Sequence, residues 1–183
     1  MGLSDAEGRR LLLIARGAVA ARLDHPLPDG TADTGDSDTL RRRAGAFVTI
    51  HLAGVLRGCI GHVEADAPVA DIVRRVAVAA ASEDPRFPAL TRVELADVVF
   101  EVSVLGPLTE LADATAIDVG RHGLVVDDGA HRGLLLPQVA VEWGWDAQTF
   151  LDQTCRKAGL PEDAWTRGAR VWTFEAQVFS EAR

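Results

Sequence analysis

The chain has 183 residues and a formal net charge of −8, with 48% hydrophobic and 25% charged residues. This length and composition are typical of one compact globular domain that buries a sizeable core. A protein that grips nucleic acid through its phosphates needs an excess of basic residues on one face. Here the only local basic cluster is the three arginines at 41–43. We therefore expect no nucleic-acid binding.

The chain has two cysteines, Cys59 and Cys155, and no CxxC pair. Two cysteines cannot build a disulfide framework, so free thiols in a reducing cytosol are the simpler interpretation. The segment "RRLLLIARGAVAARL" imitates a signal peptide, but Arg16 interrupts its apolar run, and Asp5 and Glu7 stand where a basic segment should be. No stretch approaches the roughly 18 apolar residues of a membrane span. We predict a cytoplasmic protein without membrane contact.

The first half of the chain predicts one helix, one long loop and one hairpin. Residues 5–22 repeat apolar side chains with helical spacing, and Ser4 with Glu7 forms a capping box at the start. Residues 24–44 are rich in Pro, Gly, Asp and Thr and end in the basic cluster, which predicts a flexible acidic surface loop with a basic end. Val, Ile, Thr and Phe then dominate, and Ala53 with Gly54 splits the run into two strands, 46–52 and 55–63.

The second half predicts further alternation of strands and helices. We expect a helix over 68–84, a strand over 97–108, a second hairpin over 121–139, a helix over 146–158 and a last strand over 170–181. Hairpins join neighbouring strands and helices are few. The sequence therefore predicts an α+β fold, in which a mostly antiparallel sheet is covered by helices on one side.

The segment "GVLRGCIGHVE" at 54–64 is the most informative stretch for function. In a regular strand Arg57 and Cys59 would point to one face, where the cation could stabilise a reactive thiolate, and His62 would point to the other. Gly58 and Gly61 would permit close approach of a ligand, or a bulge. The alternative is a packed strand with a buried thiol, in which the glycines serve packing alone.

Other candidate residues carry weaker arguments. Cys59 and His62 form half of a zinc site, but no further ligands occur at a repeated spacing, so we expect no metal. Cys155 lies on an amphipathic helix and is expected in the core. Trp143 and Trp145 are expected to anchor a helix edge rather than to form a stacking platform.

Glu101 is either a buried acid or, more simply, a solvent-facing strand residue. His122 could serve as a base or ligand, although a surface position is the commoner outcome. The chain contains no GxGxxG, P-loop, GxSxG or HExxH motif, so nothing in it indicates a dinucleotide, nucleotide hydrolysis, an esterase or a zinc protease. We predict no cofactor.

Seven segments resemble motifs of the AMMECR1 domain family, and they occur in the same order and at nearly the same spacing as in that family. They are "GAFVTI", "LRGCIGH", "DPRFPAL", "EVSVL", "HGLVV", "LLLPQV" and "FLDQTCRKAGL". The resemblance runs over about 45–179, and "LRGCIG" is its most specific motif. It implies one domain over 1–183 with a two-lobed α+β fold, and a signature strand near the cleft between lobes. The loop at 24–44 matches no family motif, and His62 stands where other members carry other residues.

The resemblance assigns no reaction, but it places the chain with protein A of the AmmeMemoRadiSam system. Members of this family tend to be encoded beside a Memo-like protein and a radical SAM protein. The resemblance implies a ligand- or partner-binding component that acts with them. The residues expected at a ligand are Arg57, Gly58, Gly61, His62, Glu101, His122 and Gln138.

The alternative is a cysteine-dependent enzyme with Cys59 as nucleophile. Arg57 would then bind an anionic group or stabilise the thiolate, and the backbone amides around the two glycines would hold developing negative charge. Glu101 or His122 would shuttle a proton. Abundant alanine and a single lysine, Lys157, among 19 basic residues are typical of a GC-rich bacterial genome.

Overall fold

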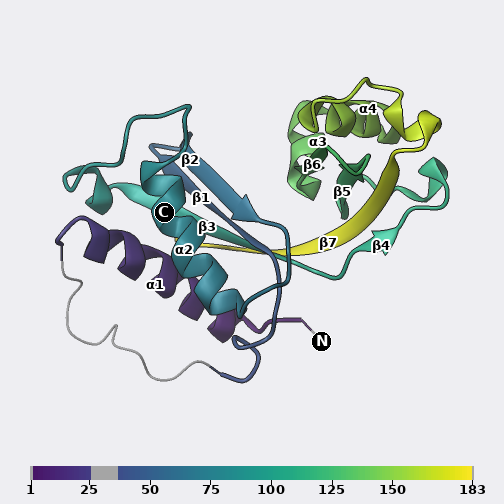
Figure 1. Ribbon diagram of the computed structural model, residues 1–183. Coiled ribbons are helices and arrows are strands. Elements are labelled where there is room, and N and C mark those ends of the chain that lie inside the picture. Colours follow the sequence, from purple (N-terminus) through teal and green to yellow (C-terminus); the bar gives the residue numbers. More distant parts are fainter. Residues whose placement is uncertain (1, 26–36, 183) are drawn as a thin grey trace. The chain divides into compact units, whose positions relative to one another are not determined.

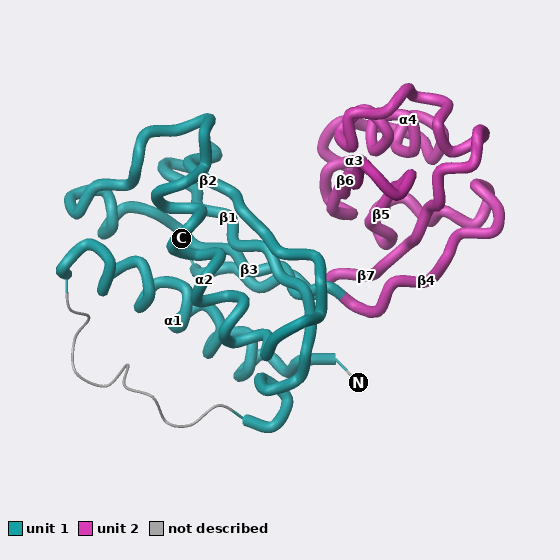
Figure 2. The backbone as a smooth tube through the Cα atoms, in the orientation of Figure 1, with its two compact units in different colours: residues 1–105, 177–183 teal, residues 106–176 magenta. Residues whose placement is uncertain are grey.

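A computed structural model describes residues 2–25 and 37–182. The chain divides into two compact units, which are described separately (Figure 2). Unit 1 is Met1–Leu105 with Gln177–Arg183, and unit 2 is Gly106–Ala176. The long last strand, β7 (Arg170–Ser180), contributes residues to both units.

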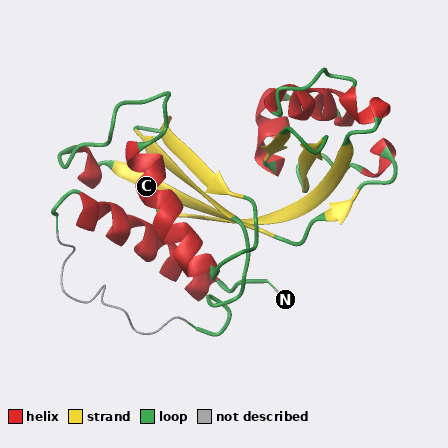
Figure 3. Ribbon diagram, viewed as in Figure 1, coloured by secondary structure: helices red, strands yellow, loops and turns green. Residues whose placement is uncertain are grey.

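Unit 1 is a small antiparallel sheet with two helices packed on one face (Figures 1 and 3). Its strands follow the order β2-β1-β3, and the end of β7 comes next to β3. Its elements are α1 (Asp5–Arg22), β1 (Ala46–Leu52), β2 (Val55–His62), α2 (Val69–Ser82), the 3₁₀ turn η1 (Glu94–Ala96) and β3 (Val98–Leu105).

Alternation along the strands decides which face of this sheet meets the helices. Val48 and Ile50 of β1 are fully buried, as are Phe100 and Val102 of β3, and they form one hydrophobic core with the buried faces of α1 and α2. The residues between them, such as Thr49 and Glu101, therefore point to the opposite face. Unit 1 thus has a helix-covered face and a second face that carries polar side chains.

The local signals read from the sequence explain the boundaries of these elements. The Ser4 hydroxyl accepts a hydrogen bond from the Glu7 backbone N–H, and the Glu7 carboxylate accepts one from Ser4 N–H, which confirms the capping box. The β1–β2 turn has positive φ angles at both central residues, 51° at Ala53 and 80° at Gly54. Such a two-residue turn matches the twist of paired strands.

Arg16 explains the interruption in the apolar run of α1. Its guanidinium forms an ion pair with Glu181 at 2.6 Å and donates to the carbonyl oxygens of Leu95 and Val98. The Glu181 carboxylate also accepts a hydrogen bond from the Phe100 backbone N–H. These bonds hold the last described residues of the chain to α1 and β3.

Unit 2 combines a second antiparallel sheet, ordered β4-β7-β5-β6, with two helices. Its core is formed mainly by Leu124 and Val126 of β5 with Phe150, Leu151 and Cys155 of α4, so the expected core position of Cys155 is confirmed. Its elements are β4 (Thr109–Glu110), η2 (Ala114–Ala116), β5 (His122–Asp127), β6 (Arg132–Leu135), α3 (Pro137–Trp143), α4 (Ala147–Lys157), η3 (Ala164–Arg167) and β7 (Arg170–Ser180).

The structure confirms the predicted α+β fold with antiparallel pairing, but it corrects one element. Residues 137–139, predicted as the end of a hairpin strand, instead begin α3. Pro137 occupies the first helical position, where its fixed φ and missing N–H suit a helix start. The apolar run before it concealed this boundary.

Part of the predicted loop at 24–44, namely residues 26–36, lies outside the described residues. Its last part is held against unit 1: Leu40 is buried, and the carbonyl oxygens of Leu40 and Arg42 accept hydrogen bonds from the first backbone amides of α2. Within the described part of the chain, no helix has the length and apolarity needed to cross a membrane.

Candidate functional site

The "LRGCIG" segment lies on β2, the edge strand of the unit 1 sheet. From Gly58 to His62 the strand pairs regularly with β1, with Cys59 opposite Thr49 and Gly58 opposite Ile50. The register then shifts, so that Leu56, rather than Arg57, is the next paired residue. Arg57 is therefore the extra residue of a β-bulge, and the bulge interrupts the alternation that would have placed it beside Cys59.

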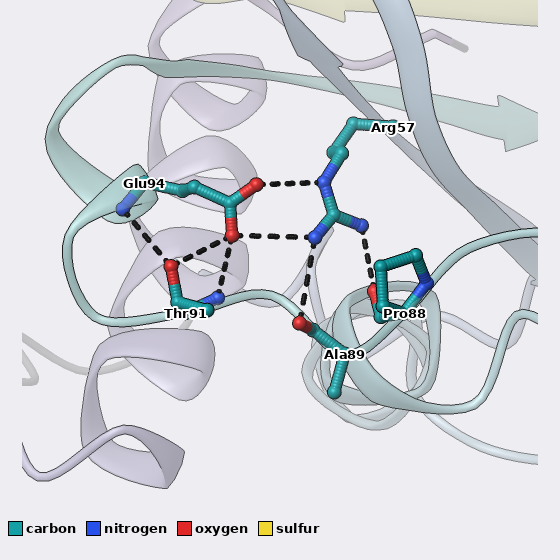
Figure 4. Close-up of polar contacts among 5 residues, drawn as sticks. All are labelled: Arg57, Pro88, Ala89, Thr91 and Glu94. Atoms are coloured by element: carbon teal, nitrogen blue, oxygen red, sulfur yellow. Dashed lines mark hydrogen bonds and ion pairs between the residues drawn. The ribbon is translucent and has the colours of Figure 1, made fainter.

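Arg57 is bound tightly to the segment that follows α2 (Figure 4). Its guanidinium donates to both carboxylate oxygens of Glu94, at 2.8 and 3.2 Å, and to the carbonyl oxygens of Pro88, at 2.7 Å, and Ala89, at 3.4 Å. The Arg57 side chain is only 13% exposed. These four bonds use most of the donor capacity of the side chain.

Glu94 completes this network from the other side. Its carboxylate also accepts hydrogen bonds from the backbone N–H and the hydroxyl of Thr91, at 2.8 and 2.7 Å. The hydrogen bonds from Arg57, followed by those from Thr91, lower the pKa of Glu94 to about 2. The pair therefore stays ionised throughout the physiological pH range and fastens residues 88–94 to the bulge of β2.

A second pair, Asp84 and Arg86, binds the free edge of β2 at Cys59. The Asp84 carboxylate accepts a hydrogen bond from Cys59 N–H at 2.9 Å, and Arg86 donates to the Cys59 carbonyl oxygen at 3.4 Å. Arg86 also forms an ion pair with Asp84 at 2.7 Å, and the guanidinium holds the pKa of that carboxyl well below its usual range. Together the two side chains occupy the positions of a neighbouring strand and protect the sheet edge.

Gly58 and Gly61 are both required by packing. A β-carbon on Gly58 would lie 2.2 Å from the Ala80 carbonyl oxygen of α2, and one on Gly61 would lie 2.1 Å from the ring of Phe47. The glycines thus allow a helix backbone and an aromatic ring to approach the strand. This is the packing alternative that the sequence left open.

The Cys59 thiol lies on the polar face, in a row that crosses three strands. Thr49 pairs with Cys59 on one side and with Glu101 on the other. The Thr49 hydroxyl donates a hydrogen bond to Cys59 Sγ at 3.3 Å. Farther along this face Ser103 is 1% exposed, and its hydroxyl has no hydrogen-bond partner among the described residues.

The surroundings of Cys59 favour the protonated thiol. Burial is the largest effect and raises the pKa of Cys59, while the negative charges of Asp84 and Glu101 raise it further. The hydrogen bond from Thr49 and the positive charge of Arg86 act in the opposite direction without reversing the shift. The cation that acts on this thiol is therefore Arg86, which the sequence analysis did not select.

The remaining candidate residues lie elsewhere. His62 points to the face opposite Cys59, as expected for a regular strand, and its Nε2 lies 2.9 Å from an Asp66 oxygen. His122 belongs to unit 2, where its Nδ1 accepts a hydrogen bond from Asp118 N–H at 3.0 Å. Gln138 lies in the first turn of α3 and is half-buried. In the described part of the chain no cluster of three or more metal-ligating side chains occurs.

Comparison with known proteins identifies the family. Residues 12–179 match the AMMECR1 family. The chain belongs to this family. A protein of Methanothermobacter thermautotrophicus is 46% identical, over 98% of this chain and 96% of that protein. One of Thermofilum pendens is 47% identical, over 98% and 92%.

The family membership extends to the three-dimensional structure. The crystal structure of the uncharacterized protein PH0010 from Pyrococcus horikoshii has a TM-score of 0.90 at 38% identity, with 98% of this chain and 93% of that chain covered. The resemblance inferred from the seven motifs is thus confirmed. These relatives are archaeal, so they give no support to a bacterial source.

Proposed function

We propose that this AMMECR1-family protein is a ligand- or partner-binding component, acting with a Memo-like protein and a radical SAM protein. The observation that carries the proposal is that the Arg57 side chain is bound to other residues of unit 1. Its four hydrogen bonds to Glu94, Pro88 and Ala89 leave it committed to holding the protein together rather than to a substrate anion. A catalytic thiol needs a cation that stabilises its charge. Arg57 makes no hydrogen bond to Cys59, and Arg86, which does act on the thiol, is paired with Asp84 and does not reverse the raised pKa of Cys59.

The row on the polar face supports binding more than nucleophilic chemistry. The raised pKa of Cys59 keeps the sulfur protonated at neutral pH, and a thiol is a much weaker nucleophile than a thiolate. Thr49, Cys59 and Glu101 place a hydroxyl, a thiol and a carboxylate in one row across the sheet. A row of such groups suits recognition of a polar group without covalent change.

The test is a retention experiment with the purified Memo-like and radical SAM proteins encoded in the same genome. The immobilised full chain should retain at least one of them in mild salt, and the Cys59→Ser variant should retain it equally well. The proposal would be overturned if neither the parent chain nor the Cys59→Ser variant retained either of the two proteins. Fast alkylation of Cys59 at pH 6–7 would also contradict it, because that result requires a stabilised thiolate.

A cysteine-dependent enzyme remains the second candidate because of one contact. The Thr49 hydroxyl donates to Cys59 Sγ, and that bond would favour a thiolate. For this candidate, Cys59→Ser should abolish pathway function in cells, while Thr49→Val should slow alkylation of Cys59. Unchanged pathway function in the Cys59→Ser strain would refute it.

A further inference from the structure

Unit 2 carries an exposed aromatic surface at the end of α3. Trp143 is the last residue of the helix. Gly144 caps the helix in the left-handed conformation, with a φ of 64°, and Trp145 is the next residue. The two indole rings stack with centroids 6.0 Å apart and planes 17° from parallel. Trp143 is 70% exposed. We call the stacked pair of Trp143 and Trp145 the Trp143 patch.

Only one of the two tryptophans has the anchoring role expected from the sequence. Trp145 packs against the hydrophobic core of unit 2, whereas Trp143 is stacked on Trp145 and remains largely open to solvent. The expectation that the pair forms no stacking platform concerns a bound ligand, so the mutual stacking of the two rings leaves it a prediction. Trp145 supports a large aromatic ring whose position is set before any partner arrives, which lowers the entropy cost of binding.

An exposed tryptophan is a strong recognition element. Indole rings are enriched at binding hot spots, and their faces attract cations more strongly than those of other aromatic side chains. The Trp143 patch therefore has the properties of a contact surface, and its electrostatic surroundings indicate what it would contact.

Those surroundings are acidic. Glu142 lies between Val141 and Trp143 in α3 and is exposed, and the exposed Asp146 directly follows Trp145. Residues 137–149 contain these two carboxylates and no lysine or arginine. These two carboxylates flank the tryptophan pair in the chain, so the segment that carries Trp143 is negative as well as aromatic.

We propose that the Trp143 patch binds an arginine-bearing apolar segment of a partner protein. The planar guanidinium would stack on Trp143 and donate to Glu142, while apolar side chains of the segment would cover the rest of the exposed indole ring. Arginine fits better than lysine because it combines stacking with bidentate donation. A second copy of this acidic chain, or an anionic lipid surface, would instead meet charge repulsion.

This inference rests on the proposed function, because it assigns a surface to the proposed partner binding. Its test uses the purified full chain and fluorescein-labelled heptapeptides, read by anisotropy at low and physiological salt. The probes are an alternating Arg–Leu peptide and its counterparts with Lys or Glu in place of Arg. We expect the Arg peptide to bind most tightly, the Lys peptide more weakly and the Glu peptide not at all.

Variants of the patch should lower affinity for the Arg peptide in a defined order. Trp143→Ala should weaken binding by roughly tenfold, and Trp143→Phe by less, in line with cation–π energies of partly desolvated sites. Glu142→Gln should weaken binding by about threefold. Val93→Ala, at a residue 83% exposed in unit 1, and Glu83→Gln, at an exposed residue after α2, should change nothing and serve as matched controls.

Three results would overturn the inference. Equal peptide affinity in Trp143→Ala and the parent chain would show general attraction to an acidic protein. Binding of the chain to phosphatidylserine vesicles without binding to the Arg peptide would identify a lipid surface instead. Unchanged acrylamide quenching after Trp143→Ala would show that Trp143 is already covered in the protein alone.

The same variants separate this inference from the proposed function. Suppose that the parent chain and the Trp143→Ala variant retain the Memo-like or radical SAM protein equally, and that the parent chain does not bind the Arg peptide. The binding role of the patch is then refuted and the proposed function stands. If the Arg peptide binds through Trp143 but neither protein is retained, the proposed function fails and the patch stands.

Discussion

Replacing Arg57 by alanine is the sharpest test of the role assigned to this residue. The change removes four hydrogen bonds and leaves the Glu94 carboxylate, which is 24% exposed, without its cation. Breaking a buried ion pair costs about 3–5 kcal/mol, whereas an exposed pair contributes about 0–1 kcal/mol. Because this pair is mostly but not fully buried, we expect the free energy of unfolding to fall by about 2–3 kcal/mol.

The measurement is urea unfolding followed by far-UV circular dichroism. All four tryptophans lie in unit 2, so fluorescence would miss the unit that contains Arg57, whereas the helical signal includes α1 and α2 of unit 1. With an unchanged slope of about 2 kcal/mol per M, the midpoint should fall by about 1–1.5 M. Arg74→Ala is the matched control, because Arg74 is half exposed and pairs with Asp71 within one helix, and it should cost about 0.3 kcal/mol.

A double-mutant cycle then shows whether the loss comes from the ion pair itself. Arg57→Ala combined with Glu94→Gln should destabilise less than the sum of the single variants, with a coupling of about 1–2 kcal/mol. If Arg57→Ala unfolded within 0.5 kcal/mol of the parent chain, as the Arg74 control should, the fastening role would be refuted. Arg57 would then be free to bind a ligand, and the argument for a non-catalytic component would lose its main support.

Three further results are expected. Because the pKa values of Asp84 and Glu94 are lowered in the folded state, both stabilise the protein above the ordinary carboxyl range near pH 4. This stability should be lost as the pH falls toward 2, and Glu94→Gln should flatten the loss in urea titrations at pH 2–6. The raised pKa of Cys59 should make iodoacetamide labelling slow at pH 7 and faster above pH 9, as followed by mass spectrometry; rapid labelling at pH 7 would contradict it. Gly58→Ala should lower the free energy of unfolding by about 2 kcal/mol or more, because the α2 backbone cannot yield as a side chain would; a neutral effect would show that α2 can move.

Elements with local signals could be predicted closely from the sequence. The helix at 5–22 coincides with α1 because the capping box of Ser4 and Glu7 marks its start and the apolar spacing runs along it. The β1–β2 turn was predictable because Ala53 and Gly54 divide a run of strand-forming residues. In unit 2 the helix predicted over 146–158 agrees equally well with α4, which begins after the Asp146 carboxylate that accepts a hydrogen bond from Thr149 N–H.

The candidate site was less predictable because one bulge changes the register. Counting back from the two-residue turn in a regular hairpin would pair Thr49 with Gly58 and Ile50 with Arg57. The extra residue at Arg57 shifts these pairs, so that Thr49 faces Cys59. No local property of "LRGCIG" shows this shift, since a bulge is decided by the long-range contacts of Arg57 with residues 88–94.

The partners of Cys59 and Arg57 were missed for the same reason, although their sequence signal was present. Asp84, Arg86 and Glu94 all lie in or just after "DPRFPAL", which was recognised only as a family motif. A single sequence cannot show that a carboxylate 25 residues after Cys59 accepts a hydrogen bond from the Cys59 backbone N–H. An Asp and an Arg two residues apart, beside a proline, could nevertheless have indicated an ion pair at a turn.

The contacts give a physical reason for "LRGCIG" and "DPRFPAL" to occur together. "LRGCIG" supplies an edge strand with a bulge, a backbone without side chains at two positions, and one arginine. "DPRFPAL" supplies the Asp84 and Arg86 side chains that pair with the strand edge, and the carbonyl oxygens of Pro88 and Ala89 that receive Arg57. Each motif satisfies polar groups that the other leaves unpaired, so their joint presence is explained by folding alone. Evidence for chemistry at this site must therefore come from the thiol itself, which makes the pH dependence of Cys59 labelling the measurement that separates a binding protein from an enzyme.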